Sequence, residues 1–303
     1  MIKMIKMIKS SVYYAARLWI RFFPFSIGKD FAWDFTSWRV LNYKTRTKFG
    51  SIMVGNTQDI IQKYIYYFGT WEPHISIFIS SRLKPGDIFI DIGSNVGYYS
   101  LLASNLVGTN GKVVAIEASP KVFDTLQKHI ALNDADNIRA ICYAVSNERT
   151  RLVIHHGESS NIGSTSIVRN FKESFHPDLE IEAAPLGDLL SHEEITKARM
   201  IKIDVEGAEW LVIEGMAQIF PLLNDDVEIL LEVSPEMLVQ FDKTINDLLD
   251  ILGKYGFYAY IVRNKYNPEE YLYNMPVSRP RRFEGSVESL VDLIFSKKNQ
   301  ERL

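Results

Sequence analysis

The chain has 303 residues, of which 47% are hydrophobic, 23% charged and 12% aromatic, so its composition excludes a disordered or collagen-like chain. The net charge is only −3, which excludes a surface that is basic throughout, and we expect no nucleic-acid partner. The single cysteine, Cys142, excludes an intramolecular disulfide and a zinc site built on cysteine pairs. One cysteine is compatible with a reducing compartment, so the sequence predicts a cytoplasmic protein.

The beginning of the chain is strongly basic. Residues 1–29 contain six Lys or Arg and no acid, a charge of +6, which leaves −9 for the rest. Ser10, Tyr14, Arg17 and Arg21 recur at helical spacing, so residues 1–30 are predicted to form a basic amphipathic segment. Its apolar runs are shorter than the ~18 residues that span a bilayer. Two interpretations stay open: peripheral contact of residues 1–29 with the inner face of an anionic membrane, or an ordinary helix packed on the protein.

Residues 31–84 are predicted to form an extension of helices and strands that precedes the main domain. Turn signals occur at Phe49-Gly50 and at Val54-Gly55-Asn56, and helices are expected near 58–68 and 75–83. The turn Lys84-Pro85-Gly86-Asp87 is of the kind that precedes a strand. We therefore expect the main domain to comprise residues 85–303.

Strand and helix patterns alternate through this main domain. Helices are expected at 96–107, 119–132, 208–220 and 237–254. Strands are expected at 87–91, 112–117, 138–143, 200–204, 227–233, 257–262 and 290–295. The alternation predicts an α/β fold with a mostly parallel seven-stranded sheet and helices on both faces. Ligands of such sheets bind at the carboxyl ends of the strands.

The segment DIGSNVG (residues 91–97) lies at such an end and continues into a helix. A dinucleotide-binding motif would require glycine at the positions of Asn95 and Tyr98. The Asp91 carboxylate would also repel a pyrophosphate, whereas it suits a ligand that carries an ammonium group. These residues favour S-adenosylmethionine over a nicotinamide cofactor, although a nicotinamide oxidoreductase and a plain packing turn remain alternatives.

Acidic side chains follow two further strands. Glu117 ends the second strand, 24 residues beyond Gly93, where an acid accepts hydrogen bonds from ribose hydroxyls; the alternative is an exposed strand-end glutamate. Asp204, Glu206 and Glu209 follow the fourth strand, and carboxylates so close repel one another unless they share a cation, a proton or donors. Glu206 and Glu209 also suit the first turn of a helix.

Four segments together resemble the FkbM family of S-adenosylmethionine-dependent methyltransferases, and the resemblance covers residues 85–262. They are DIGSNVGYYSLLAS (91–104), VVAIEASPKVFDTLQKHIALN (113–133), NIGSTSI (161–167) and MIKIDVEGAEWLVIEGM (200–216). The family implies a Rossmann-like class I methyltransferase fold with strand order 3-2-1-4-5-7-6. It also implies O-methylation of hydroxyls on sugars or polyketide-like metabolites, so the expected partner is a small-molecule or glycan acceptor.

The resemblance also implies roles for particular residues. The family pattern is altered at Ser94, which replaces the usual alanine, and at Gly187, which replaces an aspartate. The expected cofactor-binding residues are Asp91, Gly93, Ser94, Asn95 and Gly97 near the methionine part, Glu117 and Ala118 near the ribose, and Val145 near the adenine.

A hydroxyl acceptor needs a base within about 3 Å. In this fold the end of the fourth strand faces the methyl group, which makes Asp204 the first candidate, with Glu206 and Glu232 second. Among the six histidines only His74 is a candidate, and the others, His129 included, are expected at the surface. A metal between Asp204 and Glu206 lacks a dedicated ligand pattern, so we expect no metal site. A non-catalytic membrane-associated module remains a further alternative.

Overall fold

The computed structural model describes residues 2–156, 165–166, 179–265, 267–273, 279–285 and 287–303. The chain forms two compact units, which are described separately below. The first consists of Met1–Pro73, Ser159–Asn161 and Lys265–Val277, and the second of His74–Glu158, Ile162–Asn264 and Ser278–Leu303.

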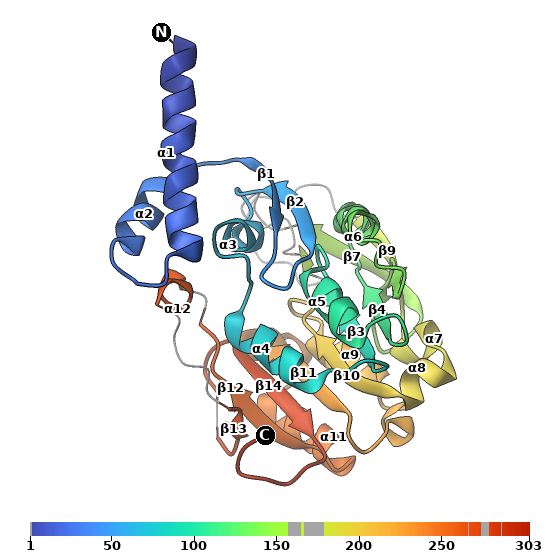
Figure 1. Cartoon of the computed structure of the whole chain (residues 1–303). Helices are drawn as coiled ribbons and strands as arrows, with labels where there is room; N and C mark the ends of the chain where they lie inside the picture. Colours follow the sequence, from blue (N-terminus) through green and yellow to red (C-terminus); the bar gives the residue numbers. More distant parts are fainter. Residues whose placement is uncertain (1, 157–164, 167–178, 266, 274–278, 286) are drawn as a thin grey trace. The chain divides into compact units, whose positions relative to one another are not determined.

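The second unit is built on a large sheet that confirms the predicted α/β fold (Figure 1). Its strands are β3 (Ile88–Ile92), β4 (Lys112–Ile116), β5 (Ile138–Ile141), β10 (Ala198–Ile203), β11 (Glu228–Val233), β12 (Tyr258–Val262), β13 (Arg281–Arg282) and β14 (Val291–Ser296). Among the described residues the sheet has eight strands in the order β13-β12-β14-β11-β10-β3-β4-β5. The strands from β5 to β11 are parallel, and β14 is antiparallel to both of its neighbours.

This order contains the expected 3-2-1-4-5-7-6 arrangement and adds the edge strand β13. The predicted number of seven strands is therefore one too few. Strand β13 pairs with β12 through only two residues, a length at which no alternation of polar and apolar residues can be recognised.

Both faces of the sheet are buried, which explains the nearly continuous apolar character of its central strands. Ile90 and Ile92 point to the same side as Ile201 and Ile203, into a core shared with helices α9 (Glu209–Gly215) and α11 (Ile245–Lys254). Because side chains alternate along a strand, Asp91 and Lys202 point to the opposite side. That side is covered by α5 (Tyr98–Val107). Further helices of this unit are α4 (Pro73–Arg82), α6 (Pro120–Leu132), α7 (Leu186–Leu189), α8 (His192–Thr196) and α10 (Pro235–Leu238).

A smaller sheet accounts for the strand-rich stretch after β5. Its strands are β6 (Ala144–Val145), β7 (Thr150–His156), β8 (Thr165–Ser166) and β9 (Leu179–Ala184), in the order β6-β9-β7-β8. Apart from Thr165 and Ser166, the family-like segment 161–167 lies outside the described residues.

The prediction of one helix over residues 237–254 is wrong, because the range is divided into separate helical segments. The chain forms α10 (Pro235–Leu238) and a 3₁₀ turn η2 (Val239–Phe241), and α11 then begins at Ile245. Asp242 has a φ of 55°, in the left-handed region that ends a helix. Thr244 and Asp247 form a capping box that starts the next one. The helix expected at 208–220 is also shorter, and is followed by a 3₁₀ turn η1 (Phe220–Leu222).

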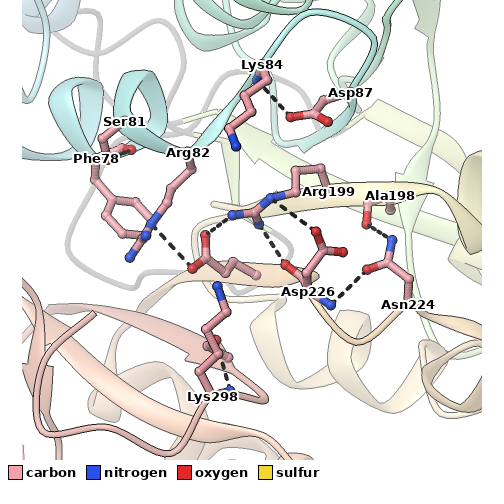
Figure 2. Close-up of polar contacts among 12 residues, drawn as sticks. Phe78, Ser81, Arg82, Lys84, Asp87, Ala198, Arg199, Asn224, Asp226 and Lys298 are labelled. Atoms are coloured by element: carbon pink, nitrogen blue, oxygen red, sulfur yellow. Dashed lines mark hydrogen bonds and ion pairs between the residues drawn. The ribbon is translucent and has the colours of Figure 1, made fainter.

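A buried charge network stabilises the amino-terminal ends of β10 and β11 (Figure 2). The fully buried Glu228 accepts a hydrogen bond from Arg199 at 3.0 Å and lies 3.4 Å from Nε of Arg82. Arg199 also donates to the backbone oxygen of Asp226 at 2.8 Å. Because this network is at the amino ends of the strands, it lies at the edge of the sheet opposite to the one where ligands bind, and its role is structural.

The first unit combines a hairpin with helices around an aromatic core. Its elements are α1 (Ile2–Phe22), α2 (Lys29–Thr36), β1 (Asn42–Arg46), β2 (Ile52–Asn56), α3 (Ile60–Phe68) and α12 (Pro268–Leu272). The side chain of Asp59 accepts a hydrogen bond from Gln62 N and caps α3, which ends at Gly69 in a left-handed conformation. Trp33 packs against Tyr64, Tyr67 and Phe68. In the part of the chain that the structure describes, no helix is long and apolar enough to cross a membrane.

Candidate cofactor and active site

The loop between β3 and α5 requires glycine at two positions. Gly93 has a φ of 75°, and a Cβ placed there would lie 1.8 Å from the backbone oxygen of Asp204. Gly97 has a φ of 86°, and its Cβ would lie 2.5 Å from Cδ1 of Leu126. The loop also contacts the neighbouring strand, because the N–H groups of Gly93 and Ser94 both donate to the carbonyl of Ile116. The glycines thus allow the close backbone approach expected of a ligand-binding turn.

His129 helps to hold this loop, although it was predicted at the surface. The prediction is wrong: His129 is fully buried, and its Nδ1 lies 2.7 Å from the carbonyl oxygen of Val96. Val122, Leu126 and His129 follow one another at i, i+4 and i+7, so the histidine shares the buried face of α6.

Asp91 provides an acceptor beneath the loop. Its side chain is fully buried, and Oδ2 accepts a hydrogen bond from the Ser100 hydroxyl at 2.5 Å. Burial raises the pKa of Asp91, while the nearby Lys202 ammonium and the Ser100 hydrogen bond act in the opposite direction. Its other oxygen, Oδ1, has no hydrogen-bond partner among the described residues. A buried acceptor without a partner is costly, and a donor such as a ligand ammonium group would satisfy it.

Glu117 lies at the end of β4 beside the same loop. It is only 5% exposed, which contradicts the alternative of an exposed strand-end glutamate. Its two oxygens accept hydrogen bonds from the N–H groups of Asn95 (2.9 Å) and Ser119 (2.8 Å). Burial is the main cause that raises the pKa of Glu117 to about 7. Each oxygen keeps a second lone pair, so the carboxylate can still accept hydrogen bonds from ribose hydroxyls.

These groups fit S-adenosylmethionine. The buried hydroxyls of Ser94 and Ser119 have no hydrogen-bond partner in the described part of the chain, so two further polar atoms are available near the loop. Ala118 is half-buried beside Glu117. Val145 is only 4% exposed and packs in the main core through β6, so any contact with adenine would come from its edge or its backbone.

Asp204 lies next to the glycine loop through the pairing of β10 with β3. The N–H of Asp204 donates to the carbonyl of Ile92 at 3.0 Å, and its carboxylate is 30% exposed. Oδ2 of Asp204 is 2.8 Å from Nζ of Lys202, a side chain that is almost completely buried. The ammonium also lies 4.9 Å from the centre of the Tyr99 ring on α5.

Sequence reasoning did not identify Lys202. The signal was present, because a lysine within the apolar strand MIKI must find an anionic partner when both faces of the sheet are covered. In the structure Lys202 is the register partner of Asp91, so its position near two carboxylates follows directly from the pairing of β3 with β10.

The other two acids of the cluster differ in environment. Glu206 is half-buried with a φ of 36°. Glu209 is 3% exposed, and its Oε1 accepts a hydrogen bond from Gly207 N at 2.8 Å. Burial, aided by the charge of Asp204, raises the pKa of Glu209 to about 7. Its position at the start of α9 agrees with a first-turn acid.

Glu232, the remaining base candidate, is half-buried near the end of β11. Ile203 pairs with Leu231, so Asp204 and Glu232 are the next residues along two neighbouring parallel strands and lie at the same edge of the sheet. His74 is buried in α4. Within the described ranges, no group of three or more His, Cys, Asp or Glu residues is arranged to hold a metal ion.

Comparison with known families identifies the domain. A family model described as a methyltransferase FkbM domain matches residues 91–258, more than half of the chain. The chain belongs to the FkbM methyltransferase family. The resemblance in the sequence is thereby confirmed, and the cofactor of the domain is S-adenosylmethionine.

Curated relatives are more distant. The chain is 28% identical over 160 residues to the hexuronic acid methyltransferase AglP of Haloferax volcanii, a match that covers 50% of this chain and 59% of the relative. It is 23% identical over 164 residues to the methyltransferase sdnD of Sordaria araneosa, covering 45% and 62%. Among solved structures, the methyltransferase FkbM from Methylobacillus flagellatus is 15% identical, with a TM-score of 0.40 and coverage of 78% of this chain and 55% of that one.

Proposed function

We propose that this protein transfers the methyl group of S-adenosylmethionine to a hydroxyl oxygen of a sugar or glycan. The observation that carries the proposal is the position of Asp204, whose backbone contacts Ile92 while its half-buried carboxylate sits beside the glycine loop. When bound, S-adenosylmethionine supplies an electrophilic methyl group on a sulfonium. The protein then has to bind, orient and desolvate the reactants, without forming a covalent intermediate.

The cofactor-binding residues have separate roles in this proposal. Asp91 accepts a hydrogen bond from the ammonium group, because its Oδ1 is a buried acceptor that lacks a partner among the described side chains. Glu117 accepts hydrogen bonds from the ribose hydroxyls while its backbone donors keep it in place. Gly93, Asn95 and Gly97 bring the backbone of the loop close to the methionine part.

Asp204 acts as the general base. An aliphatic hydroxyl becomes a good nucleophile only as its proton leaves, and a carboxylate within about 3 Å can accept that proton as the new carbon–oxygen bond forms. Lys202 donates a hydrogen bond from Nζ to Oδ2 of Asp204 at 2.8 Å, which holds the carboxylate in position at the end of β10. Glu206 and Glu232 are second candidates because they belong to the same edge of the sheet.

A sugar acceptor is supported by the relative AglP, which is a hexuronic acid methyltransferase. Hexuronic acids carry hydroxyl groups and a carboxylate, and only the hydroxyl needs a base. Methylation of the carboxylate would give a methyl ester, whereas methylation of a hydroxyl gives a methyl ether. Mild alkali cleaves the ester but not the ether, so the two products can be distinguished.

The test uses the full chain, isotopically labelled S-adenosylmethionine, and hexuronic acid glycosides beside neutral hexosides. We expect labelled, alkali-stable product and S-adenosylhomocysteine. Alkali-labile product would overturn the hydroxyl assignment, and absence of product from every sugar would overturn the sugar assignment.

A further inference from the structure

We propose that α1 and α2 of the first unit form a surface that lies on an anionic lipid membrane. Large apolar side chains are concentrated there and point to solvent. Each of five residues is between 63% and 77% exposed, and these residues are called the aromatic surface below: Phe22, Phe25, Ile27, Phe31 and Trp38. An exposed apolar area of this kind marks a contact site rather than ordinary protein surface.

The aromatic surface is held in place by ring contacts. Helix α2 lies beside the second half of α1 (Figure 1). Tyr13 of α1 stacks on Phe35 of α2 with ring centres 4.9 Å apart, and Phe31 is parallel to Phe35 at 6.3 Å. Near the end of α1, the rings of Trp19 and Phe23 are stacked. Phe25 also meets the Phe23 ring at 5.7 Å and Trp38 meets the Tyr13 ring at 6.4 Å, so Phe25, Phe31 and Trp38 each contact a neighbouring ring.

The arginines of α1 point in the other direction, toward β1 and α3 of the same unit. Nε of Arg17 donates to the carbonyl of Tyr66 at 3.0 Å, and its guanidinium also reaches Thr45. Arg21 donates to Thr45 and to the backbone oxygen of Arg46. Burial, together with the charge of Arg17, lowers the pKa of Arg21 to about 10.

The second half of α1 buries Ile20 and turns its arginines toward protein, while Trp19 and Phe22 stay exposed, so its outer side is unusually apolar for a surface helix. Trp19 and Phe22 are 40% and 68% exposed. The aromatic surface is stabilised where its rings leave water, and the headgroup region of a bilayer provides such an environment.

The charge of this segment favours lipid over a second copy of the chain. Residues 1–40 contain seven basic and two acidic residues, a net charge of +5. Lys3, Lys6 and Lys9 follow one another at three-residue spacing within α1. Lys3, Lys6 and Lys9 of two copies would repel each other, whereas anionic headgroups attract these residues.

The inward orientation of the arginines leaves fewer basic side chains to contact anionic lipid. Arg17 and Arg21 contact protein and Lys29 is 3% exposed, so three of the six basic residues before position 30 are withdrawn from the surface. We expect insertion of aromatic side chains to provide most of the affinity, and Lys3, Lys6 and Lys9 to provide the dependence on anionic lipid.

The test is sedimentation of the full chain with phosphatidylcholine vesicles, with and without phosphatidylglycerol. The double variant Phe22→Ser/Phe31→Ser should bind at least about tenfold more weakly to both, because two apolar anchors are lost. The control Val239→Ser removes a side chain of similar exposure (66%) on η2 of the other unit and should bind like the parent. Because both phenylalanines are exposed, the Tm of the double variant should match that of the parent.

A triple Lys→Gln variant at Lys3, Lys6 and Lys9 should weaken binding only to vesicles that contain phosphatidylglycerol, by about tenfold or more. The proposal is overturned if the parent binds neither vesicle type, or if the serine double variant binds as well as the parent. It is also overturned if sedimentation velocity shows a parent dimer that the double variant converts to monomer while vesicles have no effect. None of these results depends on methyl transfer.

Discussion

Lys202 Nζ lies 2.8 Å from Oδ2 of Asp204, and the lysine is the more deeply buried of the two. The residues are two positions apart, at the end of β10, so both point to the side of the sheet that α5 covers. Asp91, the register partner of Lys202 on β3, points to the same side. One buried cation therefore compensates two carboxylates, which would otherwise repel each other at the carboxyl edge of the sheet.

Substitution of Asp204 tests the general base. Asp204→Asn keeps the shape of the side chain but cannot take a proton, so methyl transfer should slow by roughly 10²–10⁴-fold. The affinity for S-adenosylhomocysteine, measured by calorimetry, should stay close to that of the parent. A variant with normal turnover would exclude Asp204 as the base, and one that loses affinity would assign it to cofactor binding. Parallel measurements on Glu206→Gln and Glu232→Gln rank the second candidates.

Replacement of Lys202 tests whether its ammonium group stabilises the fold. Lys202→Met should lower the free energy of unfolding by about 3–5 kcal/mol, because a buried carboxylate loses its counter-ion. The double variant Lys202→Met/Asp204→Asn removes one of the two uncompensated charges and should regain part of that loss, as urea unfolding would show. If the loss of stability in the double variant equals the sum of the losses in Lys202→Met and Asp204→Asn, the two residues are not energetically coupled.

The position of the main sheet and of the cofactor loop could be predicted from the sequence. The strand Ile88–Ile92 is apolar except for Asp91 and is bounded by turn residues, and the glycines of the loop are required by backbone geometry. Such signals are local, and a long alternation of strands and helices leaves few topologies. The order of the strands is implied by the resemblance to the FkbM family, because the alternation alone predicts only a mostly parallel sheet.

Contacts between distant parts of the chain could not be predicted in the same way. Arg17 is a polar residue on a helix, and its inward orientation is favourable because the Tyr66 carbonyl and the Thr45 hydroxyl accept its hydrogen bonds. His129 is another case, because its partner is the carbonyl of Val96 on a separate element. The polar partners that bury these side chains are set by tertiary structure. An interpretation that assigns polar residues to solvent therefore misplaces both, although the spacing of His129 from Val122 and Leu126 already matched the buried face of α6.

Cofactor affinity should depend on pH through Glu117. The pKa of this carboxyl is raised to about 7 by burial, so the cofactor-free protein is largely ionised at pH 8 and largely protonated at pH 6. Ribose hydroxyls donate hydrogen bonds, which favours the ionised form. The affinity for S-adenosylhomocysteine should therefore fall about tenfold between pH 8 and pH 6, a factor that corresponds to one pH unit below the pKa.

Calorimetry at several pH values measures this dependence, and Glu117→Gln is the matched control. The variant should bind more weakly at pH 8, by roughly ten- to a hundredfold, because a charge-assisted acceptor is lost. It should also lack the change in affinity between pH 6 and pH 8. A parent with constant affinity over this range would contradict the assignment of the ribose to Glu117.

Because the cofactor loop lies close to the end of β10, a single methyl group added at Gly93 should disturb the loop. A Cβ at position 93 would lie 1.8 Å from the backbone oxygen of Asp204, in a conformation with φ of 75° that alanine adopts only with strain. Gly93→Ala should therefore lower the free energy of unfolding by roughly 2–5 kcal/mol and weaken binding of S-adenosylhomocysteine as the loop moves away. Gly253→Ala is the control, because its Cβ would meet nothing within 4 Å on α11 and alanine should add about 0.5–1 kcal/mol to stability. Urea unfolding and calorimetric titration of both variants measure the two effects. Equal stability and equal affinity of Gly93→Ala and the parent would show that the loop does not depend on contact with β10.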